Sequence, residues 1–224
     1  RRGKPRKGTH SQAHFHGRLS APGLDILDGE VRSVAYDAVH RRQVAFVADA
    51  YWLIVDTLTA ESAHDYDLRF HLAPHAQGHL EVRVTEHGWV VGAPGMALIG
   101  ADGIEPHVEH GLVAPDYGIT YQAPIVSIRR SAVVDTTYAS LLVPMRDGEA
   151  VPHLQFAGDM TGWRATVSDD ACVDSIEWHP HATSIGPEGA RRMGRAEWSQ
   201  SLDAQVVRRA VADDAGGWRS WDRD

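Results

Sequence analysis

The sequence predicts an all-β protein built as an antiparallel β-sandwich. Residues His64–Leu72 alternate strictly, with Tyr66, Leu68, Phe70 and Leu72 on one side and polar residues on the other. A period of two marks a strand buried on one face only. Apolar stretches of strand length recur every 8–12 residues between Gly, Pro and Asp, and no stretch of 12 or more residues has helical periodicity. This spacing is typical of a sandwich.

The first strongly patterned region contains three expected strands. Gln43–Asp49 and Tyr51–Leu58 are separated by a tight polar break at Asp49–Ala50, and His64–Leu72 follows. Trp52–Val55 is apolar without alternation, which predicts a central strand covered on both faces.

The next region predicts a second alternating strand. Leu80, Val82 and Val84 are expected to point inward from Leu80–Thr85, and this strand is expected to pair with His64–Leu72. Ala101–Gly111 is expected to be a polar loop. Further strands are expected at Leu24–Val31, Trp89–Val91, Met96–Ile99, Ile119–Arg130, Thr137–Pro144, His153–Phe156, Trp163–Val167, Cys172–Trp178, Arg195–Ser199 and Gln205–Ala212.

The domain organisation follows from length and composition. A chain of 224 residues with 43% hydrophobic residues suits one sandwich domain over residues 1–224. Residues 1–9 are basic and predict a solvated or cut N-terminal arm, and residues 151–224 predict terminal strands with a thinner pattern. Because the chain starts at Arg1, we expect it to be a fragment or a processed product.

Charge and composition restrict the function classes. A formal charge of −8 disfavours nucleic-acid binding, and the absence of an 18-residue apolar run argues against a membrane-spanning helix. A single cysteine, Cys172, excludes an internal disulfide, and its place in an apparent strand favours a buried structural thiol over a nucleophile. No nucleophile-elbow, phosphate-loop, dinucleotide-binding or HExxH motif is present.

Several sequence blocks together resemble the C-terminal β-sandwich of heparinase II/III-type polysaccharide lyases. The blocks keep the family's order and spacing across roughly residues 24–147. They are an HRR step at His40–Arg42, YWLIVD at Tyr51–Asp56, RFHLAP at Arg69–Pro74, GLVAPDYG at Gly111–Gly118, APIV at Ala123–Val126 and SLLVP at Ser140–Pro144.

The resemblance implies a parent enzyme that cleaves uronic-acid polysaccharides by β-elimination. In such enzymes the catalytic groups come mainly from an N-terminal helical toroid and from an HxH segment. Here His14 and His16 lack the following Asp and lie too close to His40, so we interpret them as exposed strand histidines. We therefore assign no catalytic residue, no metal and no cofactor to this chain, and expect it to be inactive alone. The resemblance leaves room for a divalent metal such as zinc in the parent enzyme.

The partners implied by the resemblance are an acidic polysaccharide and the toroid of the parent chain, in the periplasm, the cell envelope or outside the cell. Candidate substrate-binding residues within the matching blocks are His40, Arg41, His71 and Tyr117. A guanidinium in the cleft suits a sugar carboxylate, whereas His40 and Arg41 could equally form structural salt bridges beside their strand. The alternative function is a carbohydrate-binding or assembly module without chemistry of its own.

Overall fold

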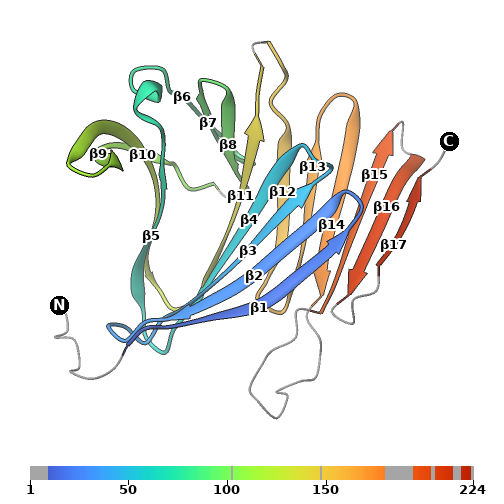
Figure 1. Cartoon of the computed structure of the whole chain (residues 1–224), viewed down its shortest axis with the longest axis horizontal. Coiled ribbons are helices and arrows are strands. Elements are labelled where there is room, and N and C mark those ends of the chain that lie inside the picture. The colour runs from blue at the N-terminus through green and yellow to red at the C-terminus, as the bar shows by residue number, and fades with distance from the viewer. Residues whose placement is uncertain are drawn as a thin grey trace.

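The protein is an antiparallel β-structure of three sheets (Figure 1). The computed structural model describes residues 10–101, 103–146, 148–179, 194–202, 205–213 and 218–222. Apart from one 3-10 turn at Pro74–Ala76, every regular element of these residues is a strand. The predicted all-β antiparallel class is therefore confirmed, and the expected arm at 1–9 lies outside the described residues. The described part contains no helix long and apolar enough to cross a membrane.

The largest sheet has eight strands and lies between the other two. We call it the central sheet. Its order is β1-β2-β3-β4-β11-β8-β7-β6, with neighbours antiparallel. The strands are β1 (Gln12–Ala21), β2 (Leu24–Arg32), β3 (Val39–Val47), β4 (Tyr51–Thr59), β11 (Thr136–Pro144), β8 (Met96–Gly100), β7 (Gly88–Ala93) and β6 (Glu81–Thr85).

Two further sheets pack on the central sheet. The six-stranded sheet follows chain order as β12 (His153–Asp159), β13 (Gly162–Ser168), β14 (Cys172–His179), β15 (Arg195–Leu202), β16 (Gln205–Asp213) and β17 (Trp218–Asp222). The three-stranded sheet has the order β5 (His64–His71), β10 (Ile119–Val133) and β9 (His107–Asp116).

The main core fills the space between the central and six-stranded sheets. Alternation along β13 and β14 directs large side chains such as Trp163, Ile176 and Trp178 inward, where they pack with Leu53 and Val55 of β4. These five side chains are 0–4% exposed. Burying each contributes roughly 1.5–3 kcal/mol, so this layer is the main source of stability.

A second core lies on the other face of the central sheet. Leu68 of β5 and Val126 and Ile128 of β10 pack against Leu98 of β8 and Tyr138 of β11. The three-stranded sheet therefore covers the β11–β8–β7 side of this face. The β1–β4 side stays partly open to solvent, because Leu27, Val31 and Trp52 are 46%, 43% and 38% exposed.

The hairpin joining β1 and β2 is held close to the six-stranded sheet at Gly23. This residue has a φ of +75°, and a Cβ there would lie 2.5 Å from Cζ3 of Trp198. Glycine is required both for the backbone conformation and for the close approach of the indole.

Most of the predicted strand pattern is confirmed. In β5, Tyr66 and Leu68 are buried and Phe70 is half-buried, and Leu72 just after the strand is also buried. The alternate residues Asp65, Asp67, Arg69 and His71 are exposed. The break at Asp49–Ala50 is the tight turn between β3 and β4, where Ala48 and Asp49 both have positive φ.

Five local predictions are wrong. β6 pairs with β7, whereas β5 pairs with β10, and Val82 and Val84 are 41% and 46% exposed. β6 is an edge strand beyond the cover of the three-stranded sheet, so its alternation does not mark a buried face. Trp52 is exposed although β4 is central, because only the opposite face of β4 is fully covered. The expected loop at Ala101–Gly111 contains the start of β9, and the side chain of His16, expected to be exposed, is only 3% exposed.

Candidate functional site

The uncovered side of β1–β4 carries a distinct set of polar and aromatic groups. We call it the open face, meaning the side chains of β2, β3 and β4 that point away from the six-stranded sheet. Alternation puts His40 and Arg42 of β3 on this face and turns Arg41 toward the interior. Its members include Asp25, Leu27, Val31, His40, Arg42, Val44, Phe46, Trp52, Ile54 and Asp56.

Asp56 organises the polar part of the open face. Its carboxylate is 1% exposed and lies 2.5 Å from Nε2 of His40. Arg42 donates from Nε at 2.6 Å and from Nη2 at 3.0 Å to the two carboxylate oxygens. The side chains of His40 and Arg42 remain 40% and 44% exposed. A buried carboxylate thus holds an imidazole and a guanidinium with their outer sides in solvent.

This arrangement gives the exposed groups defined chemistry. A carboxylate accepts hydrogen bonds, so Nε2 of His40 carries the proton and, in the neutral ring, Nδ1 is the acceptor. His40 can therefore accept a proton from a bound molecule when neutral, or bind an anion when protonated. Arg42 keeps donors that Asp56 does not use, and these suit a carboxylate or sulfate group.

An aromatic pair lies on the same two strands. Phe46 and Trp52 are register partners, and their rings stack with centroids 5.0 Å apart at 26°. They stand four residues from Arg42 and Asp56 along β3 and β4, which corresponds to about 13 Å. The open face therefore has an aromatic end and a charged end.

Arg41 lies in the interior, in a buried polar cluster between the two large sheets. Its Nε donates to Asp28 Oδ1 at 2.9 Å, its Nη2 donates to Asp28 Oδ2, and the side chains are 9% and 0% exposed. The guanidinium also lies 4.8 Å from the ring centroid of Trp178. Nearby, Trp163 donates from Nε1 to Gln43 Oε1 at 2.7 Å. These contacts fix β2 and β3 against the six-stranded sheet.

His16 is buried at the edge of this cluster. A register irregularity between Phe15 and Gly17 interrupts the alternation of β1, and the side chain of His16 is only 3% exposed. Its Nε2 lies 3.6 Å from Glu30 Oε2, and neither ring nitrogen has a hydrogen-bond partner among the described residues. Burial lowers the pKa of His16, an effect that the Asp28 carboxylate partly opposes.

This pKa shift predicts a loss of stability in acid. The unfolded chain takes up the proton near pH 6.5 and the folded chain only at lower pH, so stability falls as the pH drops through about 6.5. His16→Gln should weaken this dependence in melting temperatures measured between pH 7.5 and 5.5. His75→Gln, at an exposed histidine in the turn after β5, is the control and should leave it unchanged. The same pH dependence in the parent and in His16→Gln would contradict the assignment.

The other two sequence candidates lie on the three-stranded sheet. His71 is exposed at the end of β5, on the same side as Asp67 and Arg69. Tyr117 is fully exposed in the turn between β9 and β10, where its backbone N–H donates to Asp116 Oδ1 at 2.7 Å. Among the described residues no interaction joins His40, Arg41, His71 and Tyr117 into one site, so the structure separates the four predicted residues.

Sequence analysis missed Arg42, Asp56, Phe46 and Trp52 as members of one face. The position of the turn could have revealed this grouping from the sequence. With the turn placed at residues 48–50, antiparallel pairing puts Arg42 opposite Asp56 and Phe46 opposite Trp52.

Neither the cysteine nor any metal-binding group adds a reactive centre among the described residues. Burial raises the pKa of the Cys172 thiol to about 11, so at neutral pH it is protonated and a poor nucleophile. Among residues 10–222 as far as described, no group of three or more His, Cys, Asp or Glu side chains is placed to hold a metal ion.

Comparison with solved structures supports the fold. The heparan sulfate lyase HepC from Pedobacter heparinus has a TM-score of 0.58 and 16% identity, over 70% of this chain and 26% of the lyase. A heparinase III gene product with methylated lysines has a TM-score of 0.56 and 15% identity, over 85% of this chain and 27% of that one. This chain thus spans about a quarter of the length of these lyases.

Comparison with sequences gives the family. No curated protein matches this chain. The family model described as heparinase II/III-like, C-terminal, matches residues 21–179, which include all of β2–β14. Because this match covers well over half of the 224 residues, the chain belongs to the heparinase II/III-like C-terminal domain family.

Proposed function

We propose that this chain is the sandwich domain of a polysaccharide lyase and that its open face forms one wall of the cleft that binds a uronic-acid-containing polysaccharide. The observation that carries the proposal is the His40–Asp56–Arg42 group, in which one buried carboxylate presents an imidazole and a guanidinium to solvent. Arg42 would neutralise a sugar carboxylate, and the Phe46–Trp52 pair would support a neighbouring ring.

The chemistry of β-elimination explains why such a wall is useful. The C5 proton of a uronate becomes acidic only when the carboxylate beside it is neutralised. A guanidinium fixed by a buried partner does this without reorganisation, and His40 lies beside it as a group that can move a proton. The remaining groups of the reaction are proposed to come from the parent enzyme, so binding is the property expected of this chain by itself.

We expect Arg42→Lys to weaken binding of a heparan sulfate hexasaccharide to the purified chain by about tenfold, measured by calorimetry. Lysine keeps a positive charge beside Asp56 and loses the two-pronged donor geometry, and a charge-assisted hydrogen bond is worth about 1.5–3 kcal/mol. His40→Ala should have an effect of similar size. In the full-length enzyme the same variants should lower kcat/KM.

Arg83→Ala is the matched control, because Arg83 is exposed on β6 at the opposite edge of the central sheet. Melting temperatures show whether each variant is folded. If Arg42→Lys and His40→Ala bind the hexasaccharide as tightly as the parent, the open face is not the binding wall.

A second candidate function is supported by one observation. Leu27 and Val31 leave apolar area exposed on the open face, and such area also suits a protein partner. An assembly role predicts that the open-face variants change association with the helical part of the parent enzyme and leave oligosaccharide binding unaffected.

A further inference from the structure

The outer face of the six-stranded sheet carries an ordered set of charged side chains. Antiparallel register places Arg164, Glu177, Glu197, Val211 and Arg219 in one row across β13 to β17. Side chains on these strands alternate, and the inward neighbours, such as Trp198 and Ala210, belong to the main core. The charged row therefore faces solvent on the side away from the central sheet.

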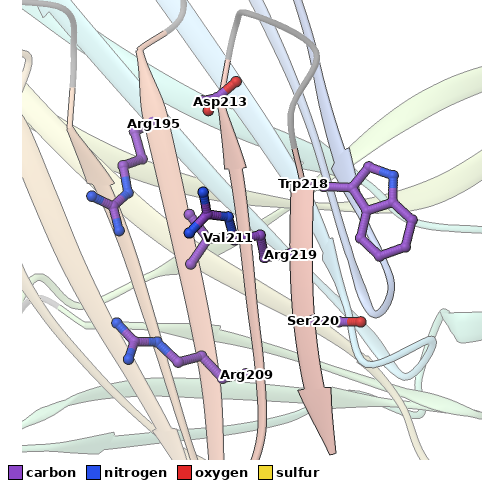
Figure 2. Close-up of a pocket in the computed structure, with 7 residues that line it drawn as sticks. All are labelled: Arg195, Arg209, Val211, Asp213, Trp218, Arg219 and Ser220. Atoms are coloured by element: carbon purple, nitrogen blue, oxygen red, sulfur yellow. The ribbon is translucent and has the colours of Figure 1, made fainter.

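Short side chains within this row create a hollow. Val211 is flanked by the long side chains of Arg195, Arg209 and Arg219. With Asp213, Trp218 and Ser220 they line a shallow hollow of about 530 Å³ (Figure 2). In Figure 2 the Arg219 side chain reaches from β17 across β16 toward Val211, whereas Trp218 points the other way. We call this the arginine hollow, lined on this face by Arg195, Arg209, Val211, Asp213 and Arg219.

The arginine hollow has surplus positive charge. Glu197 accepts from Arg195 at 2.5 Å and from Arg209 at 2.8 Å, so two guanidinium groups share one carboxylate. The hydrogen bond from Arg209 and the nearby arginine charges lower the pKa of Glu197, so it is ionised at neutral pH. Arg219 adds a third guanidinium and Asp213 a second carboxylate. The hollow is thus positive in a chain of formal charge −8.

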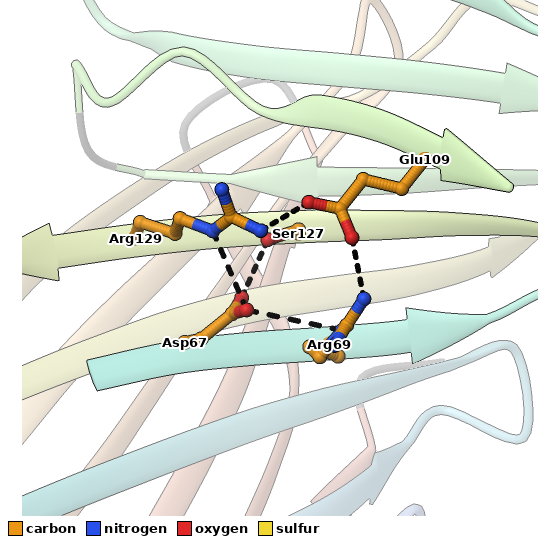
Figure 3. A network of polar contacts seen from close by, with 5 residues as sticks. All are labelled: Asp67, Arg69, Glu109, Ser127 and Arg129. Carbon is orange, nitrogen blue, oxygen red and sulfur yellow. Dashed lines mark hydrogen bonds and ion pairs between the residues drawn. The ribbon is translucent and has the colours of Figure 1, made fainter. Parts of the chain in front are cut away.

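Another arginine-rich surface in the molecule lacks this surplus. On the outer face of the three-stranded sheet, Arg69 and Arg129 pair with Asp67 and Glu109, and Ser127 also donates to Asp67 (Figure 3). Both guanidinium groups contact both carboxylates, so the group is neutral and its charges are mutually satisfied. Exposed pairs of this kind stabilise little, and this group has no surplus positive charge.

We propose that the arginine hollow is a second binding site for acidic polysaccharide, recognising sulfate or carboxylate groups on sugars. Guanidinium groups match these anions with paired donors, and Arg195 and Arg209 keep donors that Glu197 does not use. The six-stranded sheet covers the central sheet on the side opposite the open face. The two surfaces therefore lie on opposite sides of the sandwich, and the second site would retain a long chain while the open face engages another segment.

The test is the triple variant Arg195→Gln, Arg209→Gln and Arg219→Gln in the purified chain, with a heparin octasaccharide as the probe. We expect the octasaccharide affinity of the arginine hollow to fall at least tenfold relative to the parent chain. The difference between variant and parent should become smaller as the salt concentration is raised. The double variant Arg69→Gln and Arg129→Gln is the matched control and should bind like the parent. Arg42→Lys tests binding at the open face separately, so the results distinguish a wrong proposal for the hollow from a wrong proposal for the open face.

A replacement variant and a second ligand complete the test. If the triple variant is unstable, Arg219→Glu on the edge strand β17 replaces it, and this single reversal should weaken octasaccharide binding by a similar factor. A neutral dextran oligosaccharide of similar length should bind much more weakly than heparin, because it has no anionic groups for the arginines. Unchanged octasaccharide affinity in the arginine variants, or equal affinity for the dextran, would overturn the proposal.

Discussion

Replacing Arg41 by alanine should lower the free energy of unfolding by about 3–5 kcal/mol, because it leaves Asp28 charged and without its main partner in the interior. Both side chains are at most 9% exposed, and the pair is joined through both carboxylate oxygens. For a chain of this size the change corresponds to a fall in melting temperature on the order of 10 °C. Thermal denaturation followed by circular dichroism measures it.

Two further variants separate the causes of this loss. The double variant Arg41→Met and Asp28→Leu removes both charges and should recover most of the stability, because apolar replacement of a buried pair is often close to neutral. Arg18→Ala breaks an exposed pair with Asp25 and should cost less than about 1 kcal/mol. If Arg41→Ala melts as Arg18→Ala does, the Arg41–Asp28 pair does not fix β3 to β2.

Trp178→Ala should be the most destabilising of the tryptophan substitutions, at about 3–5 kcal/mol. Trp178 is 0% exposed, stacks on Trp163 with centroids 6.3 Å apart, and lies beneath the Arg41 guanidinium. The substitution opens a cavity between the two large sheets and removes the cation–π contact. Urea denaturation gives the free energy directly.

Trp52→Ala is the matched control because the same side chain is removed from the open face, where it is 38% exposed. It should cost far less stability and should instead weaken oligosaccharide binding. A large loss of stability in Trp52→Ala, with binding retained, would show that Trp52 serves packing and would contradict its place in the proposed wall.

The fold class and the burial of individual strands were predictable because they depend on local periodicity. The alternation at His64–Leu72 correctly assigns the buried side of β5, and the apolar run beginning at Trp52 correctly marks a central strand. The same reasoning was wrong for β6, since an alternating pattern at a sheet edge does not say whether another layer covers it.

The candidate site was only partly predictable, for a geometric reason. Sequence analysis chose His40 and Arg41 because both lie in a matching block and carry suitable groups, yet neighbours on a strand point to opposite faces. The structure puts Arg41 into the interior with Asp28 and brings Arg42 to the open face with Asp56. His71 and Tyr117 belong to a different sheet, which the matching blocks did not reveal.

The sequence by itself determined the antiparallel strands, the face that most of them bury and the kind of family the chain resembles, because each depends on spacing within short segments. Only the tertiary structure decided which surfaces stay open. The stacking of three sheets covers one face of β1–β4 and leaves the other exposed, and the register of the three strands β15, β16 and β17 gathers Arg195, Arg209 and Arg219 around Val211. These are contacts between layers and across strands, and nothing in the local pattern of any one strand specifies them.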